Sequence, residues 1–113
     1  MPLLPHIHIL LCTKDGEAWI SEQLKSILNQ TYSKWSLWIS DDGSSDATLR
    51  IVSDVISDNP ERYIRLFHGP QKGCARNFLS LLIRPELAGS WIAFADQDDI
   101  WMPHKLHRAI EMI

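Results

Sequence analysis

The 113-residue chain is poor in several features that would identify other classes of protein. It has two cysteines, Cys12 and Cys74, which are too few for a disulfide scaffold and indicate reduced thiols. No apolar run approaches the ~18 residues that span a bilayer. With 11 basic and 14 acidic residues the net charge is −3 and the pI about 5.9, whereas nucleic-acid-binding domains usually exceed roughly 9. We therefore expect a cytosolic chain with no nucleic-acid partner and no membrane segment. Other parts of a longer protein could attach this chain to the inner face of a membrane.

Several catalytic and binding signatures are also missing. The phosphate-binding GxxxxGK[ST] pattern and the dinucleotide pattern GxGxxG are absent. The five histidines show neither HExxH nor HxxxH spacing, which argues against a zinc site, and no GxSxG supports a serine nucleophile. The contents of hydrophobic residues (45%) and charged residues (22%) are those of an ordinary globular protein. The composition predicts a single domain over residues 1–113.

Four short apolar segments, bounded by polar, glycine or proline residues, are typical of buried strands. They begin 28 residues apart and comprise Ile7–Cys12, Trp35–Ser40, Tyr63–Phe67 and Trp91–Ala95. Apolar residues at helical spacing predict helices after Asp15-Gly16, from Ser45 or Asp46 to Asn59, from about Ala75 to Ile83, and from about Pro103. Asp15 is the expected cap of the first helix and Pro103 the expected first residue of the last. This order predicts an α/β fold with a doubly wound, mainly parallel, Rossmann-like sheet and helices on both faces.

Parallel strands bring their carboxyl ends to one edge of the sheet, which is where such folds bind ligands. Six acidic residues follow the second and fourth predicted strands: Asp41, Asp42, Asp46, Asp96, Asp98 and Asp99. An acidic chain that binds an anion at this edge needs a metal ion or backbone N–H groups. The last predicted helix runs to the end of the chain with no closing strand, so we expect a truncated part of a larger fold.

The acidic segment Asp96–Asp99 directly follows the apolar Trp91–Ala95. Three carboxylates in four residues repel one another unless cations or hydrogen-bond donors compensate them. Mg²⁺ and Mn²⁺ prefer such oxygen ligands, and Mg²⁺ commonly takes one or two carboxylates together with water and phosphate oxygens. The pair Asp96 and Asp98 fits that role. The alternative is a solvated acidic loop in which Asp99 caps the next helix.

The loop after the second strand, Asp41–Asp46, has two interpretations. Gly43 allows a tight turn, and Asp46 can cap the following helix. Asp41 and Asp42 are not needed for capping. Either they accept the ring N–H of a nucleotide base, or they hold the turn by side-chain hydrogen bonds.

Two further loops at the same edge carry weaker signals. Thr13 and Asp15 could contact a nucleotide while nearby main-chain N–H groups meet a phosphate, with helix capping as the alternative. Arg76, which follows Gly73, could clamp a diphosphate through both guanidinium nitrogens. The alternative for Arg76 is an exposed side chain beside a buried Phe78.

Three motifs in the same order resemble family 2 glycosyltransferases. They are Ile9–Glu17 with Gln23–Tyr32, then Ile39–Asp46, then Phe94–Leu106, and the resemblance extends from about Ile7 to Ile110. The sequence of residues Asp96–Trp101, together with Asn77-Phe78, resembles that of rhamnosyltransferase-type members, which build cell-surface polysaccharide. The resemblance implies a GT-A fold and an inverting transfer from a nucleoside-diphosphate sugar, UDP- or dTDP-linked, to a saccharide or lipid-linked acceptor.

The resemblance also implies roles for particular residues. Donor or nucleotide binding would involve Thr13, Asp15, Glu17, Asp41, Asp42, Arg76, Asn77 and Asp96. Asp41, with Asp42 nearby, would contact the base, while Asp98 and Asp96 would bind Mg²⁺ or Mn²⁺. Two departures from the family pattern matter: Lys14 stands where the family usually has an aromatic residue, and no residue matches the catalytic base, which we expect beyond residue 113. The expected chain is thus a donor- and metal-binding part of a larger enzyme without a base of its own.

Three other functions fit parts of the pattern. A response-regulator receiver needs an acidic pair after its first strand and a lysine after a fifth strand, and this chain has neither. A haloacid-type phosphatase places its D-x-D motif after the first strand, whereas here it follows the fourth. A non-catalytic nucleotide-binding or interaction domain stays open, and nucleotide binding without sugar transfer would distinguish it.

Overall fold

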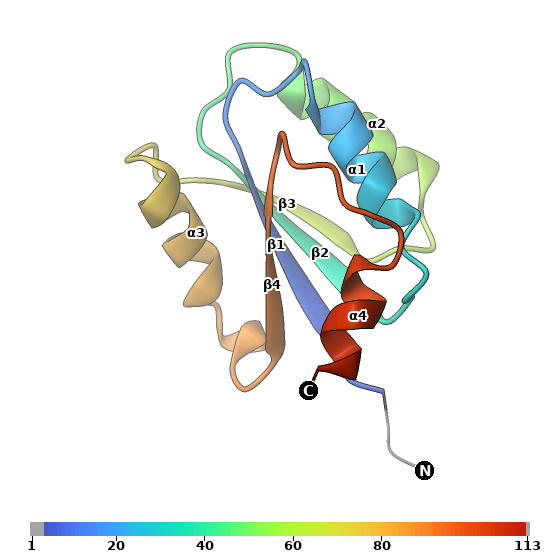
Figure 1. Cartoon of the computed structure of the whole chain (residues 1–113). Coiled ribbons are helices and arrows are strands. Elements are labelled where there is room, and N and C mark those ends of the chain that lie inside the picture. Colours follow the sequence, from blue (N-terminus) through green and yellow to red (C-terminus); the bar gives the residue numbers. More distant parts are fainter. Residues whose placement is uncertain (1–3, 113) are drawn as a thin grey trace.

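Four parallel strands form a single sheet in the order β3-β2-β1-β4 in the computed structural model, which describes residues 4–112 (Figure 1). The strands are β1 (Ile7–Thr13), β2 (Trp35–Asp41), β3 (Ile64–His68) and β4 (Trp91–Asp96). All three pairings are parallel, so the predicted parallel sheet is confirmed. Each strand runs one residue beyond its predicted carboxyl end, because the next residue still pairs with its neighbour: Thr13 lies opposite Asp41, and Asp41 opposite His68.

Helices cover both faces of this sheet, as the sequence predicts. They are α1 (Ile20–Leu28), α2 (Thr48–Asp58), α3 (Cys74–Leu82) and α4 (Lys105–Glu111), with a short 3₁₀ turn at Pro85–Leu87. In Figure 1, α1 and α2 lie on one side of the sheet and α3 on the other. The core is accordingly divided, because successive strand residues point to opposite faces: Ile9 and Leu11 pack in one apolar cluster, and Leu10 in the other with Leu81 of α3.

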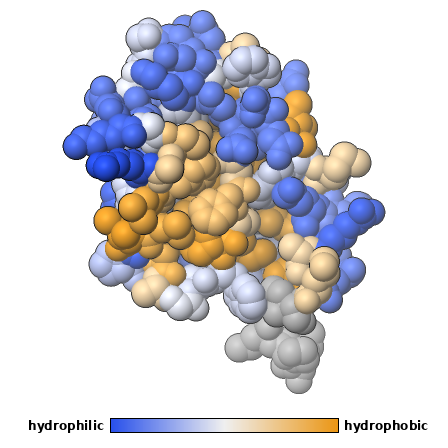
Figure 2. Space-filling model, turned by 60° about the vertical axis from the view of Figure 1, so that its left-hand side comes forward, coloured by the Kyte–Doolittle hydropathy of each residue, from blue (hydrophilic) through white to orange (hydrophobic). Residues whose placement is uncertain are grey.

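Burial separates the central strands from the outer ones. Every residue of β2 is buried, and β1 is nearly so, because each has a strand on both sides and helices on both faces. Most residues of β3 and β4 are partly or fully exposed, so the prediction of four buried strands is wrong for these two. They are the outer strands of the sheet among residues 4–112. Figure 2 shows apolar surface on the face turned forward, and the exposed apolar side chains of α3 and β4 include Leu79, Leu82 and Phe94.

Two predicted helix starts are wrong. α1 begins at Ile20, because residues 16–19 form a turn in which the Gly16 carbonyl accepts the N–H groups of Trp19 and Ile20, each at 2.9 Å. Asp15 is therefore not its cap. α4 begins at Lys105; its N-cap residue is His104, whose side chain makes no capping bond, and Asp99 does not cap the helix. Pro103 lies in the preceding turn, where its carbonyl accepts the N–H of Thr31 at 2.9 Å.

The start of α2 is close to its prediction. Asp46 lies one residue before the N-cap residue Ala47, and its carboxylate accepts the backbone N–H of Thr48 at 2.9 Å. Hydrogen bonds from Thr48, led by that of its hydroxyl, lower the pKa of Asp46. None of the helices in residues 4–112 has the length and hydropathy needed to cross a bilayer.

Candidate functional site

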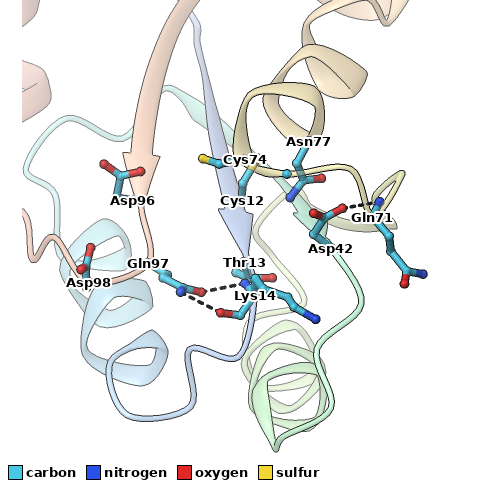
Figure 3. Close-up of a pocket in the computed structure, with 11 residues that line it drawn as sticks. Cys12, Thr13, Lys14, Asp42, Gln71, Cys74, Asn77, Asp96, Gln97 and Asp98 are labelled. Atoms are coloured by element: carbon cyan, nitrogen blue, oxygen red, sulfur yellow. Dashed lines mark hydrogen bonds between the residues drawn. The ribbon is translucent and has the colours of Figure 1, made fainter.

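A pocket of about 470 Å³ opens at the carboxyl edge of the sheet (Figure 3). Its walls come from the ends of β1 and β4, the loop after β2, and the segment that leads into α3. The predicted site residues in its lining are Thr13, Asp42, Asn77, Asp96 and Asp98. The other four predicted residues, which are Asp15, Glu17, Asp41 and Arg76, lie outside the lining.

Asp96 and Asp98 come from the end of β4 and lie on one side of this pocket (Figure 3). Both residues are exposed, and within residues 4–112 neither carboxylate accepts a hydrogen bond or forms an ion pair. In the same range no group of three or more His, Cys, Asp or Glu side chains is placed to hold a metal ion. A Mg²⁺ ion needs only one or two protein carboxylates when phosphate oxygens and water complete its shell. The donor set thus fits a cation that arrives with a phosphate ligand.

Gln97 explains why its two neighbours can face the pocket together. Its Nε2 donates to the Lys14 carbonyl oxygen and its Oε1 accepts the Lys14 N–H, each at 2.9 Å. This pair of bonds continues the contact between β1 and β4 past the last paired residues, Cys12 and Asp96. Gly16 leaves room for Gln97, since a Cβ there would lie 2.6 Å from the carboxamide carbon. The sequence analysis did not predict this role of Gln97. The one sign of it in the sequence is an amide side chain placed between two aspartates.

The two adjacent acids after β2 have different surroundings. Asp41 is 1% exposed, and its carboxylate accepts the Thr13 hydroxyl at 2.7 Å, the Ser44 N–H at 2.9 Å and the Ser44 hydroxyl at 2.6 Å. These bonds are the turn-holding alternative considered from the sequence. Asp42 lines the pocket, and its Oδ1 accepts the backbone N–H of Gln71. Of the two carboxylates, that of Asp42, which is 8% exposed, borders the pocket.

Asp15 and Glu17 connect the first loop to the start of α2. The Asp15 carboxylate accepts the Ser45 N–H at 2.8 Å, and this bond lowers the pKa of Asp15. Asp15 has a φ of 47°, a left-handed conformation that aspartate tolerates better than most residues. Glu17 accepts the N–H of Ala47 at 3.2 Å. Both carboxylates are therefore engaged with backbone outside the pocket.

The two residues of α3 in the predicted site also differ. Arg76 is exposed on the first turn of the helix and forms no ion pair within the part of the chain that the structure describes. Asn77 is 1% exposed; its Nδ2 donates to the Ser40 carbonyl oxygen at 2.9 Å, and its Oδ1 accepts the Ser40 hydroxyl at 2.6 Å. Asn77 borders the pocket while attaching α3 to the end of β2.

The charge in the pocket lining is mainly negative. Asp42, Asp96 and Asp98 contribute three carboxylates, and Lys14 is the one basic residue in that lining. The Lys14 ammonium donates to the Gly43 carbonyl oxygen at 2.8 Å and lies 3.5 Å from the Asp15 carboxylate. Because one lysine cannot balance three acids, an anionic ligand would have to bring or share a cation.

Comparison of the sequence with known proteins gives consistent results. The chain is 39% identical over 106 residues to the dTDP-rhamnosyl transferase RfbG of Shigella flexneri, covering 91% of this chain and 36% of that protein. It is 34% identical over 107 residues to WfgD of Escherichia coli, a UDP-Glc:alpha-D-GlcNAc-diphosphoundecaprenol beta-1,3-glucosyltransferase, covering 95% of this chain and 40% of that protein. The chain therefore spans well under half the length of these relatives.

Solved structures share the fold. The mannosyltransferase PcManGT of Pyrobaculum calidifontis, in complex with GDP-Man and Mn²⁺, superposes with a TM-score of 0.85 at 22% identity, over 96% of this chain and 32% of that one. TarS of S. aureus, residues 1–349 with UDP-GlcNAc, gives a TM-score of 0.71 at 22% identity, over 96% of this chain and 31% of that one. These superpositions confirm the GT-A fold that the resemblance implied. The model of the family described as "Glycosyl transferase family 2" matches residues 8–113, and on that match this chain belongs to glycosyl transferase family 2.

Proposed function

We propose that this chain binds a nucleoside-diphosphate sugar together with a divalent cation. It would do so as part of an enzyme that transfers the sugar to a saccharide or lipid-linked acceptor in cell-surface polysaccharide synthesis, in the cytosol or at the inner face of a membrane. The observation that carries the proposal is the position of Asp96 and Asp98. Both exposed carboxylates border one pocket with Asp42, at the sheet edge where open α/β folds bind ligands.

Asp98 and Asp96 are the residues that would hold the cation, Mg²⁺ or Mn²⁺. Such an ion supplies the positive charge that stabilises a departing diphosphate. Asp96, Asp98 and Asp42 repel a diphosphate in the absence of a cation, so donor binding should require the metal. Binding of GDP-Man with Mn²⁺ by the structurally similar PcManGT supports this pairing of ligands.

Asp42 is our candidate for contact with the nucleotide base. Its Oδ1 is engaged with the Gln71 N–H, which leaves Oδ2 to accept a ring N–H of uracil or thymine. The names of RfbG and WfgD, which specify dTDP-rhamnose transfer and UDP-Glc transfer, support a pyrimidine donor. Lys14, next to Thr13 in the lining, supplies a positive charge where the family usually has an aromatic ring.

Calorimetric titration with UDP, dTDP and GDP, with and without Mn²⁺, tests the proposal. We expect Mn²⁺-dependent affinity for at least one nucleotide, and we expect Asp98→Asn to weaken it by about tenfold or more, which corresponds to about 1.4 kcal/mol. Asp99→Asn is the matched control, because it removes the same charge one residue away, outside the pocket. Equal Mn²⁺-dependent affinity in the two variants would contradict the assignment of Asp98. Binding without any sugar transfer by a longer form of the protein would favour a non-catalytic nucleotide-binding domain.

A further inference from the structure

The segment between β4 and α4 carries Asp98 but has little structure of its own. Of its residues 97–104, Trp101 is the one buried side chain, at 4% exposed, and Asp98 and Ile100 are exposed. Within the segment the Asp99 N–H bonds to the Asp96 carbonyl at 3.2 Å. The segment forms neither helix nor strand, so its position depends on side-chain contacts: the bonds between Gln97 and Lys14 on one side, and a second set of groups on the other.

A buried polar stripe on and just after α1 supplies these groups. We use the term polar stripe for Gln23, Ser26 and Gln30, which are 0%, 8% and 6% exposed. Their spacing of three and four residues places them on one side of the helix. Burial of an amide or a hydroxyl is unfavourable unless it is hydrogen-bonded, so three such groups in one row require partners.

The partners are mostly the backbone of the Asp98 segment. Gln23 Nε2 donates to the Asp96 carbonyl oxygen at 2.6 Å, and Ser26 Oγ accepts the Trp101 N–H at 3.0 Å. Gln30 Nε2 donates to the Met102 carbonyl oxygen at 2.7 Å, and its Oε1 accepts the Leu106 N–H at 3.0 Å.

The members of the polar stripe are also joined to one another. The Ser26 hydroxyl, with one proton to donate, lies 2.7 Å from the Gln23 carbonyl oxygen and 2.8 Å from Gln23 Oε1, and Gln30 Nε2 lies 3.2 Å from the Ser26 carbonyl oxygen. In Figure 1 the segment that follows β4 runs beside α1 before it enters α4. The polar stripe thus attaches the segment to the helix at its start, middle and end.

We propose that Gln23, Ser26 and Gln30 are positioning residues, which hold the Asp96–Asp98 backbone in the arrangement that the cation and the diphosphate require. The proposal rests on the proposed function. Gln23 matters most, because it bonds the peptide that connects the two candidate ligands. A ligand loop held in advance binds its ion without a further loss of conformational freedom. Groups that orient metal ligands in this way typically change metal affinity by about 10- to 100-fold when removed.

The test compares Gln23→Met and Gln30→Met, which keep side-chain length and lose the hydrogen bonds, with the unsubstituted chain. The control is Leu24→Val, which alters a buried apolar residue of the same helix that makes none of these bonds. Mn²⁺ affinity is measured from the paramagnetic resonance of free Mn²⁺, and UDP and dTDP affinity by calorimetry with Mn²⁺ and with EDTA. We expect both Met variants to lose about 10-fold or more of the Mn²⁺-dependent affinity. Leu24→Val should keep that affinity, and nucleotide binding should be undetectable in EDTA for the unsubstituted chain and for every variant.

Amide hydrogen exchange gives a second readout. In Gln30→Met the Leu106 amide, which loses its acceptor, should exchange faster, and a general loss of stability would instead raise exchange in β1 and β2 as well. A folded Gln23→Met variant with unchanged Mn²⁺-dependent affinity would overturn the positioning role while leaving the proposed function intact. Absence of Mn²⁺-dependent binding in the unsubstituted chain would overturn both. If Gln23→Met does not fold, Gln30→Met decides the question, and failure of both to fold would assign the polar stripe to folding alone.

Discussion

Replacement of Asn77 by alanine distinguishes two roles for this residue. The family resemblance implied that Asn77 lies near the donor, whereas the structure shows two hydrogen bonds to Ser40, at 2.9 Å and 2.6 Å. Both residues are buried, at 1% and 0% exposed. In Asn77→Ala the Ser40 hydroxyl loses its acceptor, and the Ser40 carbonyl, which lies in the sheet between β1 and β3, loses one of its donors. We therefore expect a loss of stability as the primary effect.

The size of that loss follows from the two hydrogen bonds that disappear. A buried hydroxyl left without a partner costs about 1–3 kcal/mol, and a lost bond to a carbonyl that keeps its place in the sheet costs about 0.5–1.5 kcal/mol, so the sum is about 1.5–4.5 kcal/mol. The hydroxyl can rotate toward another acceptor, which favours the lower part of this range, about 1.5–3 kcal/mol. The free energy of unfolding of small domains is about 5–15 kcal/mol, so the variant should remain folded at room temperature but melt at a clearly lower temperature than the unsubstituted chain.

Urea denaturation followed by circular dichroism measures this effect, and Ser40→Ala provides the control background. With the hydroxyl already absent, Asn77→Ala should cost about 1 kcal/mol less than it does in the unsubstituted chain. Equal losses in the two backgrounds would show that the two side chains are not coupled. A total loss below about 1 kcal/mol, accompanied by weaker nucleotide binding, would refute the structural role and favour the donor contact.

Three further predictions concern separate features. Burial lowers the pKa of His8 below its ordinary 6.5, and the Trp38 indole donates to the His8 Nδ1 at 2.9 Å, which requires a neutral ring. The contribution of neutral His8 to the free energy of unfolding is complete above about pH 6.5 and is lost as the pH falls toward the pKa of His8 in the folded state. Urea titrations should therefore show a decline in the free energy of unfolding over that pH interval, and the decline should be absent in His8→Gln. Gly69→Ala should lower the free energy of unfolding by about 1–3 kcal/mol, because the added Cβ would clash with the side-chain oxygens of Asn77 and Asp42, the latter at 2.8 Å. An unchanged urea midpoint would contradict this packing. Cys74 and Cys12 both line the pocket, but Cys74 is exposed, whereas Cys12 is partly buried and burial raises its pKa. Iodoacetamide should therefore label Cys74 first, and nucleotide with Mn²⁺ should slow that reaction; equal labelling of both thiols by mass spectrometry would contradict the difference in their surroundings.

The strands could be predicted because their signal is local. Segments such as Trp35–Ser40 are mostly apolar, and burial on both faces of a sheet makes such a run favourable. The parallel arrangement follows from the helices between them, and it brings Asp42, Asp96 and Asp98 to one edge. Composition and order of the elements therefore determined the fold class and the side of the sheet that holds the candidate site.

Helix starts and the direction of individual carboxylates were not determined in this way. Asp15 has the right residue type for a cap, yet its carboxylate bonds to Ser45, 30 residues along the chain. Asp41 and Asp42 are chemically identical neighbours, and the sequence alone does not say which of them borders the pocket. The register of β1 against β2 decides it, because Thr13 lies opposite Asp41 and its hydroxyl engages that carboxylate.

The residues that hold the site together come from still more distant parts of the chain. Gln23 and Gln97 contact groups 73 and 83 positions away in sequence, and an amide side chain carries no local sign of its future partner. Local sequence specifies where apolar surface must be buried, since burial acts on each residue by its type. Hydrogen bonds act between particular atoms at particular distances. Only the packed tertiary structure decides which of them form, and with them the geometry of Asp96 and Asp98.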